Sequence, residues 1–470
     1  MRGFYGILFM VLLFIPASIH AQEKETDPAV LEKLERWKDL KFGFMVHWGP
    51  YSQWGVVESW TLCPEDEPWT RRTMDNYFEY RQAYENLPAT FNPLKFDPAA
   101  WAALAKEAGM KYLVFTTKHH DGFCMFDTRL TNYRITGPAC PFRTHPLANI
   151  TEVLFRAFRN EGFMIGAYFS KPDWHSEYYW WPYFPPKDRN VNYDPARYPE
   201  RWQEFKQYTY AQIEELMTGY GPIDILWLDG GWVRPIETVD DEVRSWGSFR
   251  LTDQDIDIPS IASMARRHQP GLIIVDRSVH GRFENYITPE QYIPKTVLYE
   301  PWETCMTMAG QWSYNPDDTY KTPGEIIHNL VNIVAMGGNY LLNVGPAPDG
   351  TLPPSAVSRM KQVGAWMKIN GEAIYETRPL SPCKEGNICF TGKKDGTHYA
   401  IILVDEKEPV IPINITIPAL SAKAIRQISL LGFHRPLKWK TAGGRTKIQL
   451  PAETAANTRS SALAIKIEYR

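Results

Sequence analysis

The sequence has few cysteines for its length and no excess charge of either sign. Its 470 residues include six cysteines, and no two of them form a C-x-x-C pair. A structural zinc site is therefore not expected, because such sites draw on closely spaced cysteine and histidine ligands. The 51 basic residues nearly balance the 54 acidic ones. A nucleic-acid partner is not expected either, since phosphate binding needs a concentrated basic face.

Long apolar runs are also lacking, apart from one near the N-terminus. Residues 4–15 form an apolar run after Met1-Arg2, and residues 17–21 include small residues suited to cleavage. This pattern predicts a secretory signal peptide over residues 1–21. An uncleaved anchor is the alternative, but the run is shorter than the roughly 20 residues that span a bilayer. We therefore expect an exported protein, periplasmic or extracellular, that begins near Gln22 and is not inserted in a membrane.

Strand-like apolar runs alternate with helix-like segments through most of the chain. The runs lie at residues 42–46, 112–116, 164–169, 223–228, 272–275, 297–299 and 340–344. Helical spacing is found between several of them, at 98–109, 149–162, 199–220 and 322–336. This alternation indicates a parallel sheet with crossover helices. Seven runs over about 300 residues come close to a (β/α)8, TIM-like barrel.

An open doubly wound sheet is the competing fold. Its first strand is normally followed by a glycine-rich phosphate loop. Here the sequence HWGP follows instead, at residues 47–50. The barrel is favoured.

The pattern changes after about residue 375. Short alternating runs at 399–404, 410–417, 424–431, 446–450 and 463–469 are separated by glycine, proline and charged residues. They predict a small antiparallel β-sandwich. The domain organisation expected is thus a barrel over 22–375 and a sandwich over 376–470, with the aromatic, proline-rich segment 174–198 as a loop at the barrel mouth.

Polar residues follow almost every predicted strand, at the end where parallel barrels place their reacting groups. These residues are His47, Lys118, His119, His120, Asp121, Lys171, Asp173, Asp229, Asp276, Arg277, Glu300, Glu303 and Asn343. The sharpest case is Asp229, which ends an apolar run and precedes two glycines that leave its face open. The structural alternative is an aspartate that caps the next helix or turns the chain.

The pair His119-His120 also allows two interpretations. Neighbouring residues on a strand point to opposite faces, so both rings can line one surface only if the strand has already ended. In that case both imidazoles can bind vicinal hydroxyls. Metal binding is less favoured, because no further histidine or cysteine with ligand spacing supports it. A purely structural role for one of the two stays open.

Two carboxyl groups across one cleft are typical of enzymes that cleave glycosidic bonds, where one attacks and the other protonates the departing oxygen. Asp229 is the candidate for the first role. Glu290, Glu284 and Glu58 are candidates for the second. Glu290 and Glu284 each also have a plain alternative as a solvated loop charge or a helix-start residue. The aromatic content of 14% suits a sugar site, although core packing explains most of it.

Three motifs together resemble the α-L-fucosidases of glycoside hydrolase family 29. They are FGFMVHWGPYS at 42–52, KHHDGF at 118–123 and LWLDGGW at 226–232. The resemblance runs in register from about residue 30 to about residue 350. It implies a secreted retaining exo-glycosidase that removes terminal α-L-fucose from fucosylated glycans and needs no cofactor.

The same resemblance implies roles for particular residues. Asp229 corresponds to the nucleophile, while the acid/base is expected at Glu290 by its spacing from Arg277, with Glu284 in reserve. The residues expected to bind substrate are His47, Glu58, Trp60, His119, His120, Tyr168, Trp227, Arg277 and Trp302. The sequence differs from the usual Glu-Trp-Tyr of the first loop, because it reads Glu-Ser-Trp at 58–60.

The sequence is also compatible with two other functions. One is a glycan-binding barrel that has lost catalysis, which the retained carboxylates argue against. The other is an exo-glycosidase for a related sugar such as a galactoside, since the choice between a methyl and a hydroxymethyl group depends on pocket shape.

Overall fold

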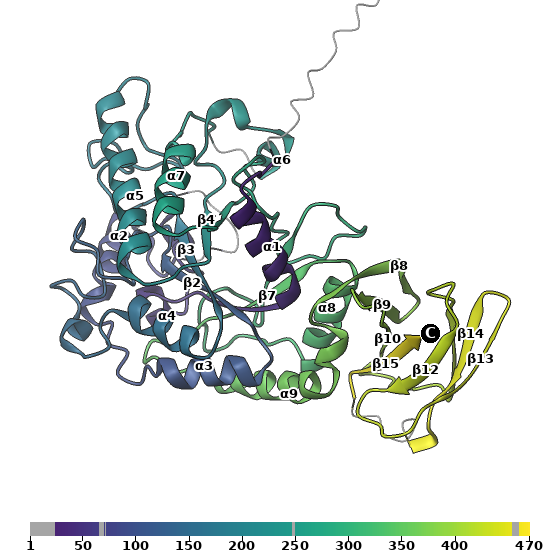
Figure 1. Cartoon of the computed structure of the whole chain (residues 1–470). Coiled ribbons are helices and arrows are strands. Elements are labelled where there is room, and N and C mark those ends of the chain that lie inside the picture. The colour runs from purple at the N-terminus through teal and green to yellow at the C-terminus, as the bar shows by residue number, and fades with distance from the viewer. Residues whose placement is uncertain (1–23, 65–69, 71, 247–249, 454–459) are drawn as a thin grey trace, which may run out of the picture.

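The computed structural model describes residues 24–470 except 65–69, 71, 247–249 and 454–459 (Figure 1). The predicted signal peptide, residues 1–21, lies outside the described residues, so export stays a prediction that the N-terminal sequence of the mature protein would test. Within the described part, no helix has the length and apolar character needed to cross a membrane.

A parallel sheet of seven strands forms the larger part of the molecule. The strands are β1 (Phe42–Val46), β2 (Tyr112–Lys118), β3 (Met164–Ser170), β4 (Ile225–Asp229), β5 (Ile273–Asp276), β6 (Glu303–Thr307) and β7 (Asn339–Val344). Their order is β5-β4-β3-β2-β1-β7-β6, and every neighbouring pair is parallel. Every residue of these strands is buried except Asp229. Strands buried on both faces are what a helix-covered TIM-like barrel requires, and this predicted fold class is confirmed.

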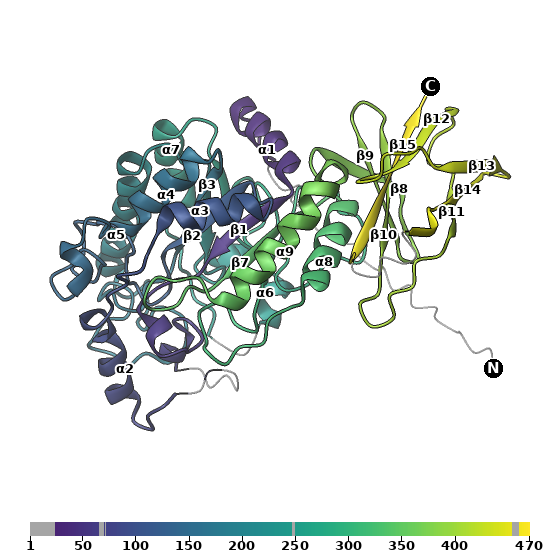
Figure 2. The same cartoon turned by 90° about the horizontal axis from the view of Figure 1, so that it is seen from below.

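Helices cover the outside of the curled sheet (Figures 1 and 2). They are α1 (Pro28–Leu40), α2 (Tyr77–Glu85), α3 (Pro98–Glu107), α4 (Ile150–Asn160), α5 (Pro199–Gly219), α6 (Asp241–Ser245), α7 (Ile258–His268), α8 (Pro323–Ala335) and α9 (Pro354–Asn370). The four helices predicted from periodicity correspond to α3, α4, α5 and α8. Local capping fixes such starts: before α8, Thr322 and Glu325 form a capping box, and Pro323 occupies the first turn.

The edges β5 and β6 are joined by an irregular segment, residues 284–291, rather than by an eighth strand. On one side the amide of Asn285 donates to the carbonyl of Ile274 at 2.9 Å. On the other, the amide of Glu303 donates to Ile287 (2.9 Å), and that of Gln291 donates to Cys305 (3.0 Å). The segment therefore occupies the place of a strand and satisfies both exposed edges of the sheet.

The prediction of a sixth strand at 297–299 is wrong. Val297 and Tyr299 lie in an exposed loop, with exposed fractions of 41% and 101%, and Glu300 is exposed as well. The strand begins at Glu303 and has the sequence ETCMT. Because this sequence is largely polar, it does not form an apolar run that would predict a strand. Glu303 therefore opens the strand instead of following it, and its buried carboxylate accepts a hydrogen bond from the Tyr112 hydroxyl at 2.6 Å.

The C-terminal part consists of two antiparallel sheets, as predicted. Their strands are β8 (Thr377–Glu385), β9 (Ile388–Lys393), β10 (His398–Leu403), β11 (Asn414–Pro418), β12 (Ile425–Leu430), β13 (Lys438–Ala442), β14 (Arg445–Gln449) and β15 (Ala462–Tyr469). One sheet has the order β12-β15-β10-β9-β8 and the other β11-β14-β13, and they share one apolar core. The sequence interpretation missed β8, β9 and β13. Helix α8 packs against β8 and β9, which places the sandwich beside the barrel (Figure 2).

One helix contact gives a stability prediction. A Cβ added at Gly364 in α9 would lie 2.2 Å from the carbonyl oxygen of Glu107, which ends α3. We expect Gly364→Ala to lower the free energy of unfolding by about 1–3 kcal/mol, because the two helices must move apart. Gly219→Ala in α5 is the matched control: nothing lies within 4 Å of its Cβ position, so higher helix propensity should leave stability equal or slightly raised. Urea unfolding measures both, and equal effects would contradict the contact.

Candidate active site

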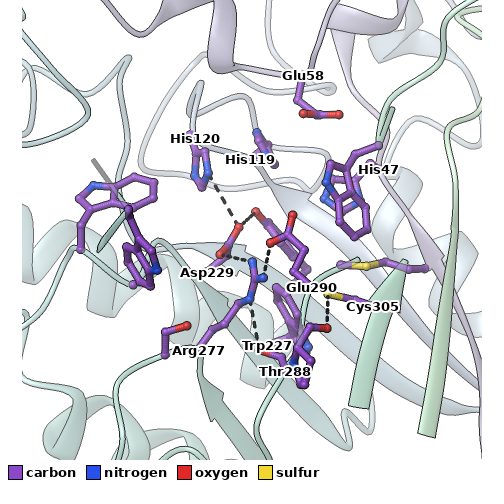
Figure 3. A pocket seen from close by; sticks show the side chains of 18 of the residues that line it. His47, Glu58, His119, His120, Trp227, Asp229, Arg277, Thr288, Glu290 and Cys305 are labelled. Carbon is purple, nitrogen blue, oxygen red and sulfur yellow. Dashed lines mark hydrogen bonds and ion pairs between the residues drawn. The ribbon is translucent and has the colours of Figure 1, made fainter. Parts of the chain in front are cut away.

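A cavity of about 420 Å³ opens at the carboxyl ends of the barrel strands (Figure 3). Nearly all residues predicted to act on substrate line it: Asp229, Glu290, Glu284, His47, Glu58, Trp60, His119, His120, Tyr168, Trp227 and Arg277. They come from strand ends and loops spread over more than 200 residues of sequence, from 47 to 290. The barrel brings them together because the carboxyl ends of parallel strands meet at one edge.

Trp302 is the exception among these residues. It precedes β6, is 1% exposed and does not line the cavity. Its indole packs so closely under Gly338 that an added Cβ there would lie 2.6 Å away. The resemblance implied a substrate-binding role for Trp302, but the structure places this residue in the core, directly before β6 and away from the cavity.

Asp229 ends β4 with its carboxylate in the cavity. Its Oδ2 accepts a hydrogen bond from the Tyr168 hydroxyl at 2.6 Å, and its Oδ1 accepts one from Nη1 of Arg277 at 3.2 Å. The next residue, Gly230, has φ of +89°, and a Cβ there would lie 2.3 Å from Pro172. Only glycine fits this turn, which leaves the carboxylate facing the cavity instead of capping a helix.

The surroundings keep Asp229 ionised. Burial alone would raise the pKa of this carboxyl group, but Arg277, His120 and the Tyr168 hydroxyl together hold the pKa well below its ordinary value. About 16% of the side chain is exposed, so the anion remains accessible from the cavity. An ionised, positioned carboxylate can act as a nucleophile.

Three histidine rings line the cavity beside Asp229, and each is held through Nδ1. The partners are Asn343 Oδ1 for His47 (2.8 Å), Ser59 Oγ for His119 (2.6 Å) and Ser170 Oγ for His120 (2.8 Å). Strand β2 ends at Lys118, so the condition for both neighbouring rings to share one surface is met. Their centroids are 4.2 Å apart. Nε2 of His120 lies 3.8 Å from Oδ2 of Asp229, beside the position a ligand would take at this carboxylate.

These histidines are neutral over the physiological range. Burial lowers the pKa of His47 and of His120 to about 4, although the Asp229 charge partly opposes this. Burial also lowers the pKa of His119, and the neighbouring rings lower it further. A neutral imidazole offers one donor and one acceptor, which suits recognition of sugar hydroxyl groups.

One group in the described part of the chain has the spacing of a metal site. His119, His120 and Asp229 each bring a ligand atom to within 4.8 Å of the others. The Arg277 cation already contacts the carboxylate of this group, at 3.2 Å. A divalent ion would have to share the carboxylate with that positive charge, so the donor set is poorly suited to one.

Arg277 connects the two candidate catalytic carboxylates. Its Nη1 contacts Asp229, its Nη2 pairs with Glu290, and its Nε donates to the Thr288 hydroxyl at 3.2 Å (Figure 3). The guanidinium carbon lies 5.3 Å from the ring centroid of Trp227, which forms the floor beneath it. One rigid cation therefore fixes the relative position of both carboxylates.

Glu284 lines the cavity but is bound to its own loop. Its Oε1 accepts from the amide of Ser278 at 2.9 Å, and its Oε2 lies 2.7 Å from Nδ1 of His280. Only 4% of its side chain is exposed, against 40% for Glu290. Glu290 is therefore the more accessible carboxylate opposite Asp229.

Glu58 and Trp60 enter the cavity from the loop after β1. Glu58 is 1% exposed, its Oε1 accepts from the amide of Ser313 at 2.7 Å, and burial raises its pKa to about 8. The group is thus protonated at neutral pH and can donate a hydrogen bond. Trp60 packs edge-to-face on His120, with centroids 5.3 Å apart, so it is the tryptophan of the Glu-Ser-Trp sequence that reaches the site.

The sequence interpretation missed several lining residues, among them Met45, Arg189, Trp232, Trp246, Tyr292, Cys305 and Trp312. Trp312 lies with its ring 5.0 Å from that of His47, and its carbonyl accepts from Asn343 at 2.7 Å. It follows β6, so a correctly placed sixth strand would have identified it. Met45 and Cys305 lie within strands and carried no such signal.

Comparison with known proteins agrees with this geometry. The alpha-L-fucosidase family model matches residues 14–372. The chain is 29% identical over 425 residues to tissue alpha-L-fucosidase of Mus musculus, covering 86% of this chain and 85% of that protein. It is 28% identical over 455 residues to plasma alpha-L-fucosidase of Rattus norvegicus, covering 93% and 92%.

Solved structures give the same result. Alpha-L-fucosidase isoenzyme 1 from Paenibacillus thiaminolyticus superposes with a TM-score of 0.75 at 28% identity, covering 94% of this chain and all of that one. Thermotoga maritima alpha-fucosidase in complex with fucose gives 0.70 at 26% identity, covering 95% and 100%. Because the family match spans most of the chain and includes the whole cavity, this chain belongs to the alpha-L-fucosidases of glycoside hydrolase family 29 and is a glycoside hydrolase.

Proposed function

We propose that the chain hydrolyses terminal α-L-fucosyl linkages of glycans with retention, using Asp229 as nucleophile and Glu290 as acid/base. The observation that carries these roles is the shared guanidinium of Arg277, which contacts both carboxylates. Thermotoga maritima alpha-fucosidase, similar over 95% of this chain, has been solved with a mechanism based inhibitor. That finding supports a covalent mechanism here.

In the first step a carboxylate oxygen of Asp229 attacks the anomeric carbon of the fucosyl group. The bond from that carbon to the glycosidic oxygen breaks, and protonated Glu290 gives its proton to the departing oxygen. The products are a fucosyl-aspartate ester and the free aglycone alcohol. Arg277 and the Tyr168 hydroxyl keep the attacking carboxylate oriented.

In the second step the roles of Glu290 change. Its carboxylate takes a proton from water while the water oxygen attacks the anomeric carbon. The ester bond to Asp229 breaks, and fucose leaves with its original configuration. Both residues return to their starting protonation states, so no cofactor takes part.

The remaining lining suits a 6-deoxy sugar. Three neutral histidines and protonated Glu58 can bind its hydroxyl groups, while Met45 and Trp312 add apolar surface for a methyl group. A galactoside would place a hydroxymethyl group against that apolar surface, which disfavours this alternative. The ionised nucleophile and its paired glutamate argue against a binding-only protein.

The first test replaces the nucleophile. Asp229→Gly should lower kcat on aryl α-L-fucosides on the order of 10⁴-fold, because no ester can form. Added azide should restore turnover and yield the fucosyl azide of inverted configuration, seen by NMR. Asp224→Gly is the matched control, because Asp224 directly precedes β4, does not line the cavity and is partly exposed. Full turnover by the Asp229 variant without azide would reject the assignment.

The second test decides between Glu290 and Glu284 as the acid by comparing substrates with different leaving groups. Glu290→Gln should lower kcat/KM on a fucosyl disaccharide on the order of 10²- to 10⁴-fold, since the departing oxygen needs a proton. On α-L-fucosyl fluoride, the kcat/KM of the same variant should be much closer to that of the wild type, because fluoride leaves without protonation. Glu284→Gln should show no such selectivity. If Glu284→Gln shows the leaving-group dependence instead, the assignment is reversed.

The third test measures how kcat/KM on α-L-fucosyl fluoride depends on pH. Because fluoride leaves without protonation, the ionisation of the proposed acid, Glu290, does not limit this rate. Glu58 is protonated below its raised pKa of about 8 and loses its donor proton above it. We therefore expect kcat/KM to fall as pH rises through about 8. Glu58→Gln keeps a neutral donor that cannot ionise, so that fall should vanish. A wild-type profile that stays flat to pH 9 would show that the neutral form is not required.

A further inference from the structure

The cavity has a second aromatic feature, beside the proposed acid/base and outside the group of residues that surrounds Asp229. Tyr292 follows Glu290 by two residues and lines the same cavity. Its side chain is 59% exposed, so the ring lies at the cavity mouth. None of the roles assigned above to fucose binding or to bond cleavage uses it.

The backbone that carries Tyr292 is held firmly by strand β6. The amide of Gln291 donates to the carbonyl of Cys305 at 3.0 Å, and the carbonyl of Tyr292 accepts from the Thr304 hydroxyl at 3.1 Å. Gln291 has φ of +61° and turns its side chain away to Thr307, at 3.2 Å. Its neighbours on both sides line the cavity. The ring is thus presented from a fixed backbone, which lowers the entropy lost on binding.

The proposed role of Glu290 as the acid determines where the aglycone binds. In the proposed mechanism the acid protonates the oxygen that joins fucose to the aglycone, so the first aglycone ring begins beside that carboxyl group. Trp246, another aromatic residue of the cavity wall, packs over Gly231, two residues after the nucleophile. It thus lies beside the turn that follows Asp229, whereas in the proposed mechanism the aglycone departs on the side opposite Asp229.

We propose that Tyr292 is the leaving-group subsite, a platform on which the C–H face of the aglycone pyranose packs. The inference rests on the proposed function, because it takes Glu290 as the acid. A flat, exposed aromatic ring packs well against the C–H face of a sugar. Water at the cavity mouth can hydrogen-bond to the hydroxyl groups of the aglycone. Ile287 and Pro289 extend the apolar surface on the same segment.

The test compares two substrates that share fucose and differ in the leaving group. One is α-L-fucosyl fluoride, which has no aglycone ring, and the other is the fucosyl-galactose or fucosyl-N-acetylglucosamine disaccharide that the wild type cleaves fastest. For Tyr292→Ala, the ratio of kcat/KM on the disaccharide to kcat/KM on the fluoride should fall about three- to tenfold, the value of one aromatic packing contact. Tyr292→Phe should keep the wild-type ratio, since the flat ring remains.

Tyr299→Ala is the matched control, a fully exposed tyrosine of the same loop that does not line the cavity, and it should leave both values unchanged. If Tyr292→Ala folds poorly, Tyr292→Leu removes the flat ring and keeps apolar bulk, and the same fall in the ratio is expected. An unchanged ratio, or an equal loss on both substrates, would overturn the subsite. Failure of the wild type to hydrolyse the fluoride would instead overturn the proposed function.

Discussion

The site depends on one cation placed between two carboxylates. Asp229 and Glu290 would repel each other in a partly buried cavity, and burial by itself would push a carboxyl group toward its neutral form. Arg277 contacts both, so it offsets the repulsion and keeps Asp229 ionised. A planar guanidinium with fixed donor directions also sets the spacing of its partners. A lysine could supply the charge but not this geometry.

The irregular closure of the barrel explains how Glu290 comes to face Asp229. Residues 284–291 bridge β5 and β6 through backbone hydrogen bonds, where a regular strand would alternate its side chains inward and outward. An irregular segment can instead present consecutive residues to one cavity, and Ile287, Thr288, Pro289 and Glu290 all line it. In place of one strand, the barrel thus has a segment that carries the proposed acid/base, Glu290, and is followed directly by Tyr292.

Not every charge at a strand end serves the substrate. Lys118 pairs with Asp173 at 3.1 Å, and Lys171 pairs with Asp276 at 2.5 Å, all four being fully buried or nearly so. The first pair connects the end of β2 to the loop after β3, and the second connects that loop to the end of β5; none of the four residues lines the cavity. Removing one partner would leave an uncompensated buried charge, which is strongly destabilising. Their place at the strand ends resembled that of Asp229, yet all four are used in ion pairs and none lines the cavity.

The sequence alone determined the barrel, the sandwich and the place of Asp229, His47, His119, His120 and Arg277, because periodicity and the residues after apolar strands are local signals. It misplaced the sixth strand, and with it Glu303, because a strand made largely of polar residues buried by its neighbours has no local apolar pattern. The choice between Glu284 and Glu290 was likewise left to tertiary structure. Both lie on one loop, and only the packing of that loop between β5 and β6 decides which carboxylate reaches Arg277 and which stays bound to Ser278 and His280.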